Sequence, residues 1–423
     1  VSMVYLFIYL LPLNGNNNNN RDMKLFRNIC IIVLFSTLFF NPVDAQNVYN
    51  FSKAEAIEHA MNNNYEVIYS EKNIEAAKQQ MREATSFGLP QISGSVDYTD
   101  NIALPTSVIP GDFFGQPGEE VEIQFGTKYN MNAGLFASQL IFDGRYIVGL
   151  QTAKVFMEKA SVDFFKDKVA VKQQVANSYY NVLSTEEAMW VVDTTLAVTK
   201  KLAEETRLTY EVGFVEDIDV DQLELLVVDL EASKVHLQNQ LNIAHSFLKF
   251  YLGLNEQDSI ILKDDIENLI STRENSSVVS EQFNYRENVD YVSLAKQKEI
   301  RYLQVKLEKT AYMPSLNANI NVMTNAQRNE WDFFDPGGKW YTSSAFGVSL
   351  QIPIWSSGER NAKVKQAKIA YDQIGVLENQ MITSLNLQFQ TAKNEYMNAV
   401  TVYRNKDKAR KVAEKIFTTT SIK

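Results

Sequence analysis

Few residues in this 423-residue chain have the type and spacing that an active site or a metal site needs. The three histidines, His59, His236 and His245, lack the spacing of metal ligands, so a packed or surface position on a helix is the simpler interpretation. Cys30 is the one cysteine, and no phosphate-binding glycine loop or nucleophile elbow is present. The sequence therefore predicts no enzyme, no cofactor and no metal.

Acidic residues gather instead beside one turn between two helical segments. The turn, Tyr-Glu-Val-Gly-Phe-Val-Glu at 210–216, is followed at alternate positions by Asp217, Asp219 and Asp221. Aspartate is favoured in the first turn of a helix because its charge interacts well with the helix dipole. The residues alone therefore indicate a solvated helix start.

The elements that position this turn occur twice along the chain. Residues 90–98, Pro-Gln-Ile-Ser-Gly-Ser-Val-Asp-Tyr, are echoed at 314–322 by Pro-Ser-Leu-Asn-Ala-Asn-Ile-Asn-Val. The copies are 224 residues apart at this proline and 214 apart at a later glycine (Gly144 and Gly358), so the first copy has the longer loop. Each copy reads as a helix, a strand pair and a long helix, which predicts an internal structural duplication.

Long helices dominate the pattern. No proline interrupts 146–210, which predicts a helix of roughly 65 residues, on the order of 100 Å long. Segments 52–87 and 216–252 predict two helices of about 36 residues each, which end to end would match the long one. Apolar and small residues recur at heptad-like spacing and favour close packing of several helices. In the long helix this stripe is Leu150, Ala153, Met157, Ala160, Phe164, Val171, Val175, Ser178 and Val182.

Strands are expected at 90–104, 125–142, 315–323 and 346–354. Along 315–323, for example, apolar residues alternate with serine and asparagine. This alternation is typical of a barrel with lipid outside and water inside, but a half-buried sheet on a soluble core has the same period. Four strands cannot close a membrane barrel, so a barrel would need several chains.

Aromatic residues crowd the loops that connect these strands. They are Phe113 and Phe114 in one loop and Trp331, Phe333, Phe334, Trp340 and Tyr341 in the other. Aromatic side chains suit a membrane interface, and they equally suit packing within a loop.

The N-terminus is expected to be targeting sequence. Residues 1–22 read as an overextended start, and 23–45 as a signal peptide that ends in Val43-Asp44-Ala45. Beyond residue 45 no apolar stretch approaches 18 residues, so no membrane-spanning helix is expected. The formal net charge of −10 argues against nucleic acid as a partner.

Together these features resemble the TolC family of outer-membrane efflux channels. The resemblance is carried by the duplicated strand that starts with proline, the Phe142-Asp143-Gly144 turn into a long helix, the turn at 210–216 and the Leu252-Gly253-Leu254 close of the first half. It implies a mainly α-helical homotrimer. Each chain would give four strands to a shared 12-stranded β-barrel in the outer-membrane lipid and its helices to a coiled-coil α-helical barrel in the periplasm.

The resemblance also implies function and partners. The chain would be a passive, gated conduit for small molecules such as drugs, or for secreted protein. A periplasmic adaptor and an inner-membrane pump, proton-driven (RND) or ATP-driven (ABC), would supply substrate and energy. A periplasmic adaptor-like coiled-coil scaffold is the alternative, although adaptors place one helical hairpin between soluble β-domains.

The family's entrance lies at the tips of its helical hairpins. By position this implies adaptor contact at Val212, Gly213, Phe214 and Val215, and a gate at Tyr210, Asp217, Asp219 and Asp221. The family has leucine where this chain has Phe214, which leaves the choice of adaptor open. Carboxylates that converge from three subunits would repel, so closure would need hydrogen-bond donors and opening would be a helix shift between two states.

The domain organisation follows from the repeat. We expect a first repeat at 46–254, an equatorial linker at 255–285 and a second repeat at 286–423. The equivalent of 210–254, with the gate residues of the second repeat, would fall beyond Lys423, so the expectation is a fragment or a gene whose end is assigned too early.

Overall fold

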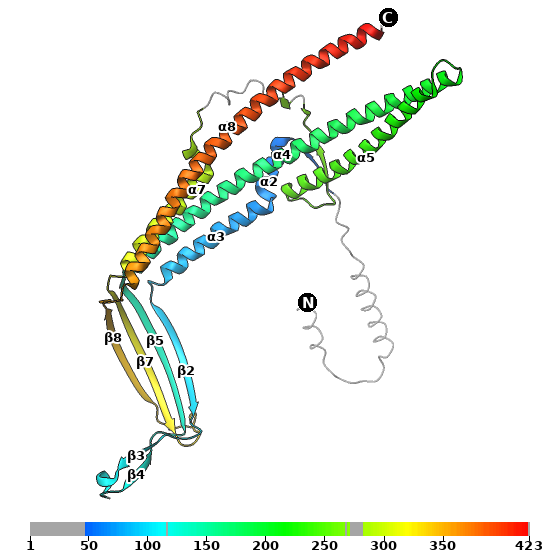
Figure 1. Ribbon diagram of the computed structural model, residues 1–423. Coiled ribbons are helices and arrows are strands. Elements are labelled where there is room, and N and C mark those ends of the chain that lie inside the picture. Colours follow the sequence, from blue (N-terminus) through cyan, green and yellow to red (C-terminus); the bar gives the residue numbers. More distant parts are fainter. Residues whose placement is uncertain (1–46, 116, 267–268, 271–281, 422–423) are drawn as a thin grey trace, which may run out of the picture. The chain divides into compact units, whose positions relative to one another are not determined.

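The chain is described here from a computed structural model (Figure 1). The described residues are 47–115, 117–266, 269–270 and 282–421. The expected start extension (1–22), the signal peptide (23–45) and Cys30 lie outside them. The described part divides into two units, 47–49 with Gln257–Ile261 and the described residues of Asn50–Glu256 and of 262–421.

The smaller unit holds most of a two-stranded sheet of β1 (Val48–Phe51) and β6 (Ser259–Leu262). Within it the Asn47 N–H lies 3.3 Å from the Asp258 carboxylate, and the Ser259 N–H donates to the Asn47 carbonyl at 2.9 Å. The expected irregular linker therefore contains a strand, and its residues 267–268 and 271–281 lie outside the described part of the chain.

Four antiparallel strands form the main sheet of the larger unit, in the order β2-β5-β7-β8. Their bounds are Gln91–Asp100 for β2, Tyr129–Asp143 for β5, Ser315–Arg328 for β7 and Tyr341–Gln351 for β8. The expected strand at 90–104 is too long, because β2 ends at Asp100 and the chain then leaves the main sheet for a separate hairpin that starts at Thr106. The strand expected at 346–354 is Tyr341–Gln351, so it starts five residues earlier and ends before Pro353, which has no N–H to donate to a ladder.

The longer loop of the first copy forms its own hairpin, which the sequence did not predict. β3 (Thr106–Pro110) pairs with β4 (Glu120–Gln124), and a 3-10 turn, Gly111–Phe114, lies between them. The second strand of the main sheet consequently starts at Tyr129 rather than at residue 125.

Strand β5 runs directly into the long helix. A bulge leaves Ile141 unpaired, since Leu140 faces Asn317 and Phe142 faces Leu316. Helix α4 (Gly144–Glu211, 68 residues) begins at the next glycine, and the Asp143 carboxylate accepts a hydrogen bond from the Arg145 N–H at 2.6 Å. The Phe142-Asp143-Gly144 turn predicted from the sequence therefore both ends β5 and caps α4.

The other predicted helices are also present, with one correction. α5 spans Asp217–Leu252, α7 spans Val289–Thr310 and α8 spans Glu359–Ser421. The helix expected at 52–87 is two helices, α2 (Lys53–Asn63) and α3 (Tyr65–Ser86). Asn64 separates them because its side-chain oxygen caps α3 at Glu66 N–H, 2.8 Å away, and its amide donates to the Tyr251 carbonyl at 2.7 Å.

Helix α4 is the centre of the packing. It contacts α2, α3, α5 and α7, and α7 also contacts α8, as Figure 1 shows. The core is a thin seam of fully buried side chains along α4, namely Val171, Val175, Tyr179 and Val182. The stripe expected from the sequence has Ser178 in place of Tyr179, but Ser178 is only half-buried. Residues 401–420 of α8 are exposed apart from the half-buried Asp407.

Candidate functional site

The turn between α4 and α5 projects two apolar side chains. Gly213 has φ +82°, a left-handed conformation that glycine adopts at little cost. Its N–H donates to the Tyr210 carbonyl at 2.8 Å, and the Phe214 N–H donates to the Thr209 carbonyl at 3.1 Å, which closes the end of α4. Phe214 is 83% exposed and Val212 68% exposed, whereas Val215 is half-buried. The four residues expected to contact an adaptor thus lie together, with two of them available for binding.

The acids expected at the gate lie in the first turns of α5. Asp217, Asp219 and Asp221 are all exposed. One Asp219 carboxylate oxygen lies 3.2 Å from the Glu216 N–H, and the two residues form a capping box. Asp219 therefore has a structural role in the single chain. Within the described residues, the half-exposed Tyr210 forms no hydrogen bond with these acids.

Two ion pairs join the helices behind the turn. Lys200 of α4 lies 2.6 Å from Glu231 of α5, and Lys234 of α5 lies 2.7 Å from Asp193 of α4. All four side chains are about half exposed, so each pair adds little to the free energy of folding. The pairs mainly keep α4 and α5 aligned. The turn is therefore presented at the end of an aligned helical hairpin.

The main sheet has one apolar and one polar face. The strand register places apolar residues in shared rows, such as Ile92–Ala137–Ile320–Phe346. Most large side chains on this face are exposed, including Ile92, Val96, Leu135, Ile320, Val322, Phe346, Val348 and Leu350. No described element of the chain covers them. A half-buried sheet on a soluble core, the alternative left by the sequence, does not match this exposure.

The polar face carries serine, asparagine and glycine in the same rows. One row is Ser138–Asn319–Gly347 and the next is Ser93–Phe136–Asn321–Ala345. Phe136 is an aromatic exception on this face. The two outer strands, β2 and β8, each have one unpaired edge in the single chain, which is a template for pairing with another strand.

Some aromatic residues in the loops beyond the sheet pack within the loop, and others are exposed as expected at a membrane interface. Phe333 is 2% exposed and packs edge-to-face on Tyr98 and Trp331, with ring centroids 6.0 and 6.4 Å apart. Trp331 and Phe334 are largely exposed. The loop thus packs on one aromatic residue and presents others, as a membrane interface requires. The side chains of Phe113 and Phe114 lie outside the described part of the chain.

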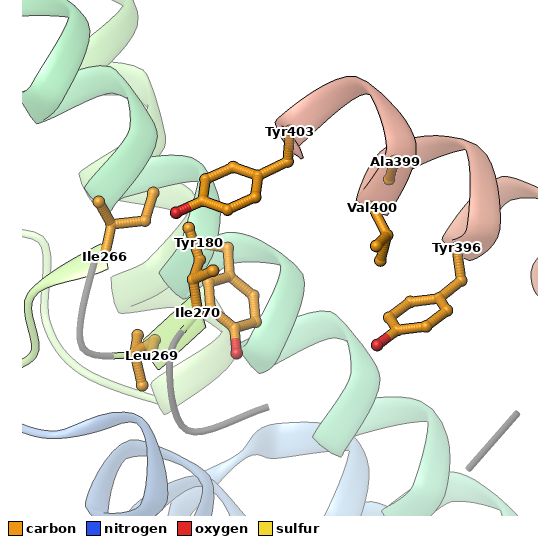
Figure 2. A pocket seen from close by; sticks show the side chains of 8 residues that line it. All are labelled: Tyr180, Ile266, Leu269, Ile270, Tyr396, Ala399, Val400 and Tyr403. Carbon is orange, nitrogen blue, oxygen red and sulfur yellow. The ribbon is translucent and has the colours of Figure 1, made fainter. Parts of the chain in front are cut away.

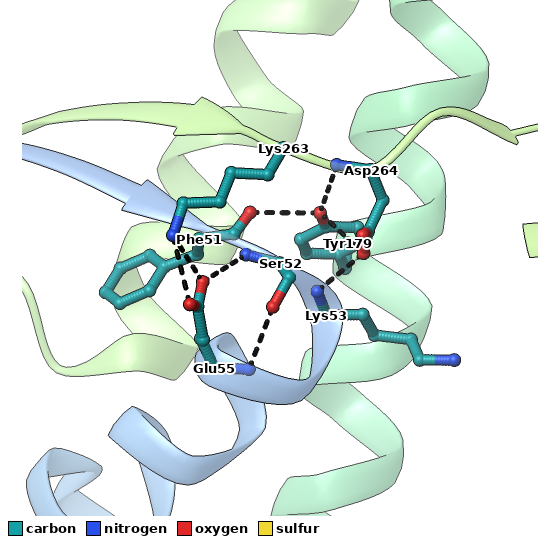
Figure 3. Close-up of polar contacts among 7 residues, drawn as sticks. All are labelled: Phe51, Ser52, Lys53, Glu55, Tyr179, Lys263 and Asp264. Atoms are coloured by element: carbon teal, nitrogen blue, oxygen red, sulfur yellow. Dashed lines mark hydrogen bonds and ion pairs between the residues drawn. The ribbon is translucent and has the colours of Figure 1, made fainter. Parts of the chain in front are cut away.

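A polar cluster, which the sequence did not predict, joins the middle of α4 to the start of α2 and to the segment after β6. The hydroxyl of the buried Tyr179 lies 3.1 Å from both the Phe51 carbonyl and the Asp264 carboxylate, the contacts drawn in Figure 3. The same carboxylate accepts from the Lys53 N–H at 2.7 Å. Burial raises the pKa of Tyr179, which keeps its hydroxyl neutral as a donor. The signal was in the sequence, because Tyr179 continues the four-residue spacing of Val171 and Val175.

An exposed ion pair flanks this cluster. Lys263 Nζ lies 2.8 Å from a Glu55 carboxylate oxygen, and the other Glu55 oxygen is 3.0 Å away (Figure 3). The hydrogen bond from Lys263 lowers the pKa of Glu55 to about 2. Glu55 also accepts from the Ser52 N–H at 2.8 Å and completes the cap of α2.

An apolar cavity of about 340 Å³ lies between α4 and α8 (Figure 2). Its lining residues are Tyr180, Ile266, Leu269, Ile270, Tyr396, Ala399, Val400 and Tyr403. The lining side chains offer three tyrosine hydroxyls as polar groups, and Tyr180 already accepts from Lys53 Nζ at 2.9 Å. The cavity therefore provides packing surface and no set of reactive groups.

Other chemistry is sparse in the described part of the chain. No group of three or more potential metal-ligating side chains occurs there, and no described helix is apolar and long enough to cross a bilayer. His245 lies 3.6 Å from Glu186, and His59 packs on the Phe51 ring with centroids 5.1 Å apart.

The sequence matches one family model, the outer membrane efflux protein, over residues 56–254 and 293–421. It is 22% identical over 320 residues to the outer membrane protein TolC of Vibrio cholerae serotype O1, covering 75% of this chain and 68% of that protein. It is 20% identical to the TolC of Salmonella enteritidis, covering 81% of this chain and 66% of the relative. The chain thus spans about two thirds of the length of these relatives.

The fold is similar to that of a solved channel. The CmeC outer membrane channel of Campylobacter jejuni superposes with a TM-score of 0.59 at 18% identity, over 79% of this chain and 68% of that chain.

Proposed function

Because the chain belongs to the outer membrane efflux protein family, we propose that three copies assemble into one passive export channel of a tripartite system. The family places the protein in the cell outer membrane, with a helical tunnel in the periplasm. The family match supports the channel function and not the adaptor-like scaffold.

The uncovered apolar face and open edges of the main sheet carry this proposal. Four strands are too few to close a barrel, and β2 and β8 run in opposite directions at the two edges. Pairing β8 of one copy with β2 of the next continues the antiparallel order, and three copies give twelve strands. The apolar face then meets outer-membrane lipid and the polar face lines a water-filled pore.

The helical hairpin provides the contact for a periplasmic adaptor. Phe214 and Val212 form an exposed apolar tip on a turn whose shape Gly213 sets. Tyr210 and Ile218 beside the tip are exposed as well, and a group of neighbouring exposed apolar side chains is typical of a protein interface. The adaptor would link this tip to an inner-membrane pump, of RND or ABC type, which supplies the energy.

The acids of α5 form the gate in this proposal, with Asp219 central and Asp217, Asp221 and Tyr210 beside it. Carboxylates that approach from three copies repel, so the closed state needs donors from neighbouring helices. Transport then requires no bond to be made or broken by the protein, and we propose that the chain has no catalytic activity of its own.

Fractionation and conductance test this proposal together. The protein should appear in the outer-membrane fraction as a detergent-stable trimer that dissociates on heating, and it should conduct ions in planar bilayers. A monomer that remains in the aqueous periplasmic extract would contradict the proposal.

A further inference from the structure

The polar face of the main sheet carries one carboxylate away from its ends. Charged residues of the four strands, all of which the structure describes, are Asp97, Asp100, Asp143 and Arg328. Asp143 caps α4 through the Arg145 N–H. Asp100 and Arg328 share the last row of the sheet with Tyr129. Asp97 is thus the charge left on the polar face itself.

The strand register places Asp97 among uncharged neighbours. Its row is Asp97–Asn132–Asn325–Tyr341, and the next row towards the helices is Ser95–Gly134–Met323–Ser343. Asp97 is exposed, and within the described chain its carboxylate has no hydrogen bond or ion pair. Nothing on this face compensates its charge.

We propose that Asp97 sets the charge preference of the pore, so that the channel passes cations, and positively charged small molecules, more readily than anions. This inference rests on the proposed trimeric channel and adds a substrate class to it. A three-fold axis places one Asp97 from each copy at the same height. The three carboxylates form a ring six residues, or about 20 Å, along β2 from its start at the helices.

The dimensions of such a pore let this ring act on the ions inside it. Twelve strands about 4.8 Å apart and tilted about 40° enclose a backbone radius of about 12 Å. Side chains that point inward bring the carboxylates to about 8 Å from the axis, which is also about the Debye length at 0.15 M salt. Three charges at that distance favour a monovalent cation over an anion by on the order of fivefold at 0.15 M salt. At 1 M salt the preference falls to about 1.5-fold.

The loops at the same end of the sheet carry charge of the same sign. Residues 101–128 contain four acids, Asp112, Glu119, Glu120 and Glu122, and one lysine, Lys128. Residues 329–340 contain three acids and one lysine. An acidic mouth raises the local concentration of cations, so it acts in the same direction as the Asp97 ring.

Reversal potentials in planar bilayers test the assignment. The full-length channel is measured under a KCl gradient at low and at high salt, with Asp97→Asn as the isosteric neutral variant. The matched control is Asp100→Asn, which removes the same charge from the same strand three residues away, on the opposite face. We expect a K⁺ over Cl⁻ permeability ratio of about 5 near 0.15 M salt for the parent and the control. For Asp97→Asn we expect a clearly lower ratio near 0.15 M salt, reduced to the smaller cation preference that the acidic mouth and the proposed gate acids leave.

The outcomes separate this inference from the proposed function. No conductance from any variant would contradict the channel itself. Conductance with a ratio that Asp97→Asn leaves unchanged would contradict the role of Asp97, and an equal fall in both variants would assign selectivity to the diffuse charge of the mouth. A shift to anion preference in Asp97→Lys, with trimer yield retained, would support the ring further.

Discussion

The Tyr179 hydroxyl of α4 lies 3.1 Å from the Asp264 carboxylate, although the two residues are 85 positions apart in the sequence. Asp264 also accepts from the Lys53 N–H, and the tyrosine hydroxyl reaches the Phe51 carbonyl. One buried phenol thus joins the long helix to the start of α2 and to the segment after β6 (Figure 3).

Removing this hydroxyl should weaken the fold at mid-helix. Tyr179→Phe removes one hydrogen bond to the Phe51 carbonyl and one to the Asp264 carboxylate, which keep the Lys263 N–H and the Lys53 N–H as donors. Because one of the two lost bonds goes to a charged group, we expect a loss of about 1–3 kcal/mol in the free energy of unfolding. Denaturant unfolding of the purified protein, followed by circular dichroism, measures this loss. Tyr180→Phe is the control, because its half-buried hydroxyl accepts from a lysine that water can solvate instead. Equal losses in both variants would contradict a special role for Tyr179.

The ion pair beside it should make stability depend on pH in a defined window. The hydrogen bond from Lys263 holds the pKa of Glu55 at about 2, below the 4.5 of a free glutamate, so its contribution is present above pH 4.5. That contribution is lost as the pH falls from about 4.5 to 2. Melting temperatures of the parent and Glu55→Gln should therefore differ at pH 7 and converge towards pH 2.

Salt and a second acid give the controls for this pH effect. Because the pair is half exposed, high salt should shrink the difference at pH 7. Glu58 is exposed on the same helix and has no ion pair in the described chain. A Glu58→Gln curve that parallels that of Glu55→Gln would show that the effect is general helix charge and not the Lys263 pair.

Two glycines should respond to alanine in opposite ways. A Cβ at Gly213 or at Gly149 meets no atom within 4 Å, so only backbone conformation distinguishes them. Gly213→Ala should destabilise the hairpin by about 1–2 kcal/mol, because φ +82° is unfavourable for alanine. Gly149→Ala, inside α4, should stabilise by about 0.5–1 kcal/mol. Thermal denaturation measures both, and the same sign for the two would contradict this account of the turn.

Two substitutions of Asp219 can separate its structural role in the cap of α5 from its proposed role in the gate. Asp219→Gln retains the side-chain type that completes a capping box but removes the charge, whereas Asp219→Ala removes both. A gate that depends on charge predicts raised resting conductance in both variants, with α5 stability lowered in the alanine variant alone. Parental conductance in Asp219→Gln would assign the residue to the cap of α5.

Much of the architecture could be predicted because long-range periodicity is strong in this sequence. The helix expected at 146–210 is Gly144–Glu211, since no proline interrupts it, and the returning helix expected at 216–252 is Asp217–Leu252. The alternation along β7 and β8 predicted the two faces of the sheet, because the side-chain period of a strand does not depend on its partner.

Details that depend on tertiary contacts could not be predicted. The break at Asn64 needs the Tyr251 carbonyl, 187 residues away, as its partner. The bulge at Ile141 arises where β5 pairs with β7, and the Tyr179–Asp264 bond joins separate elements. The functions of Phe214 and Asp219 remain predictions, because their proposed partners belong to other chains.

Disulfide cross-linking across the seam tests the shared barrel most directly. In a Cys30→Ser background, Ser93→Cys on β2 is combined in turn with a cysteine at Ser343, Ala345, Gly347 or Ser349 on β8. These positions share the polar face, and a disulfide needs Cα atoms within about 7 Å. The matched control is Ser138→Cys with Asn319→Cys, which face each other within one chain.

We expect covalent dimers and trimers for one of these combinations, and a control that cross-links without any increase in mass. If the control forms its disulfide while no β2–β8 combination links two chains, the shared barrel is contradicted.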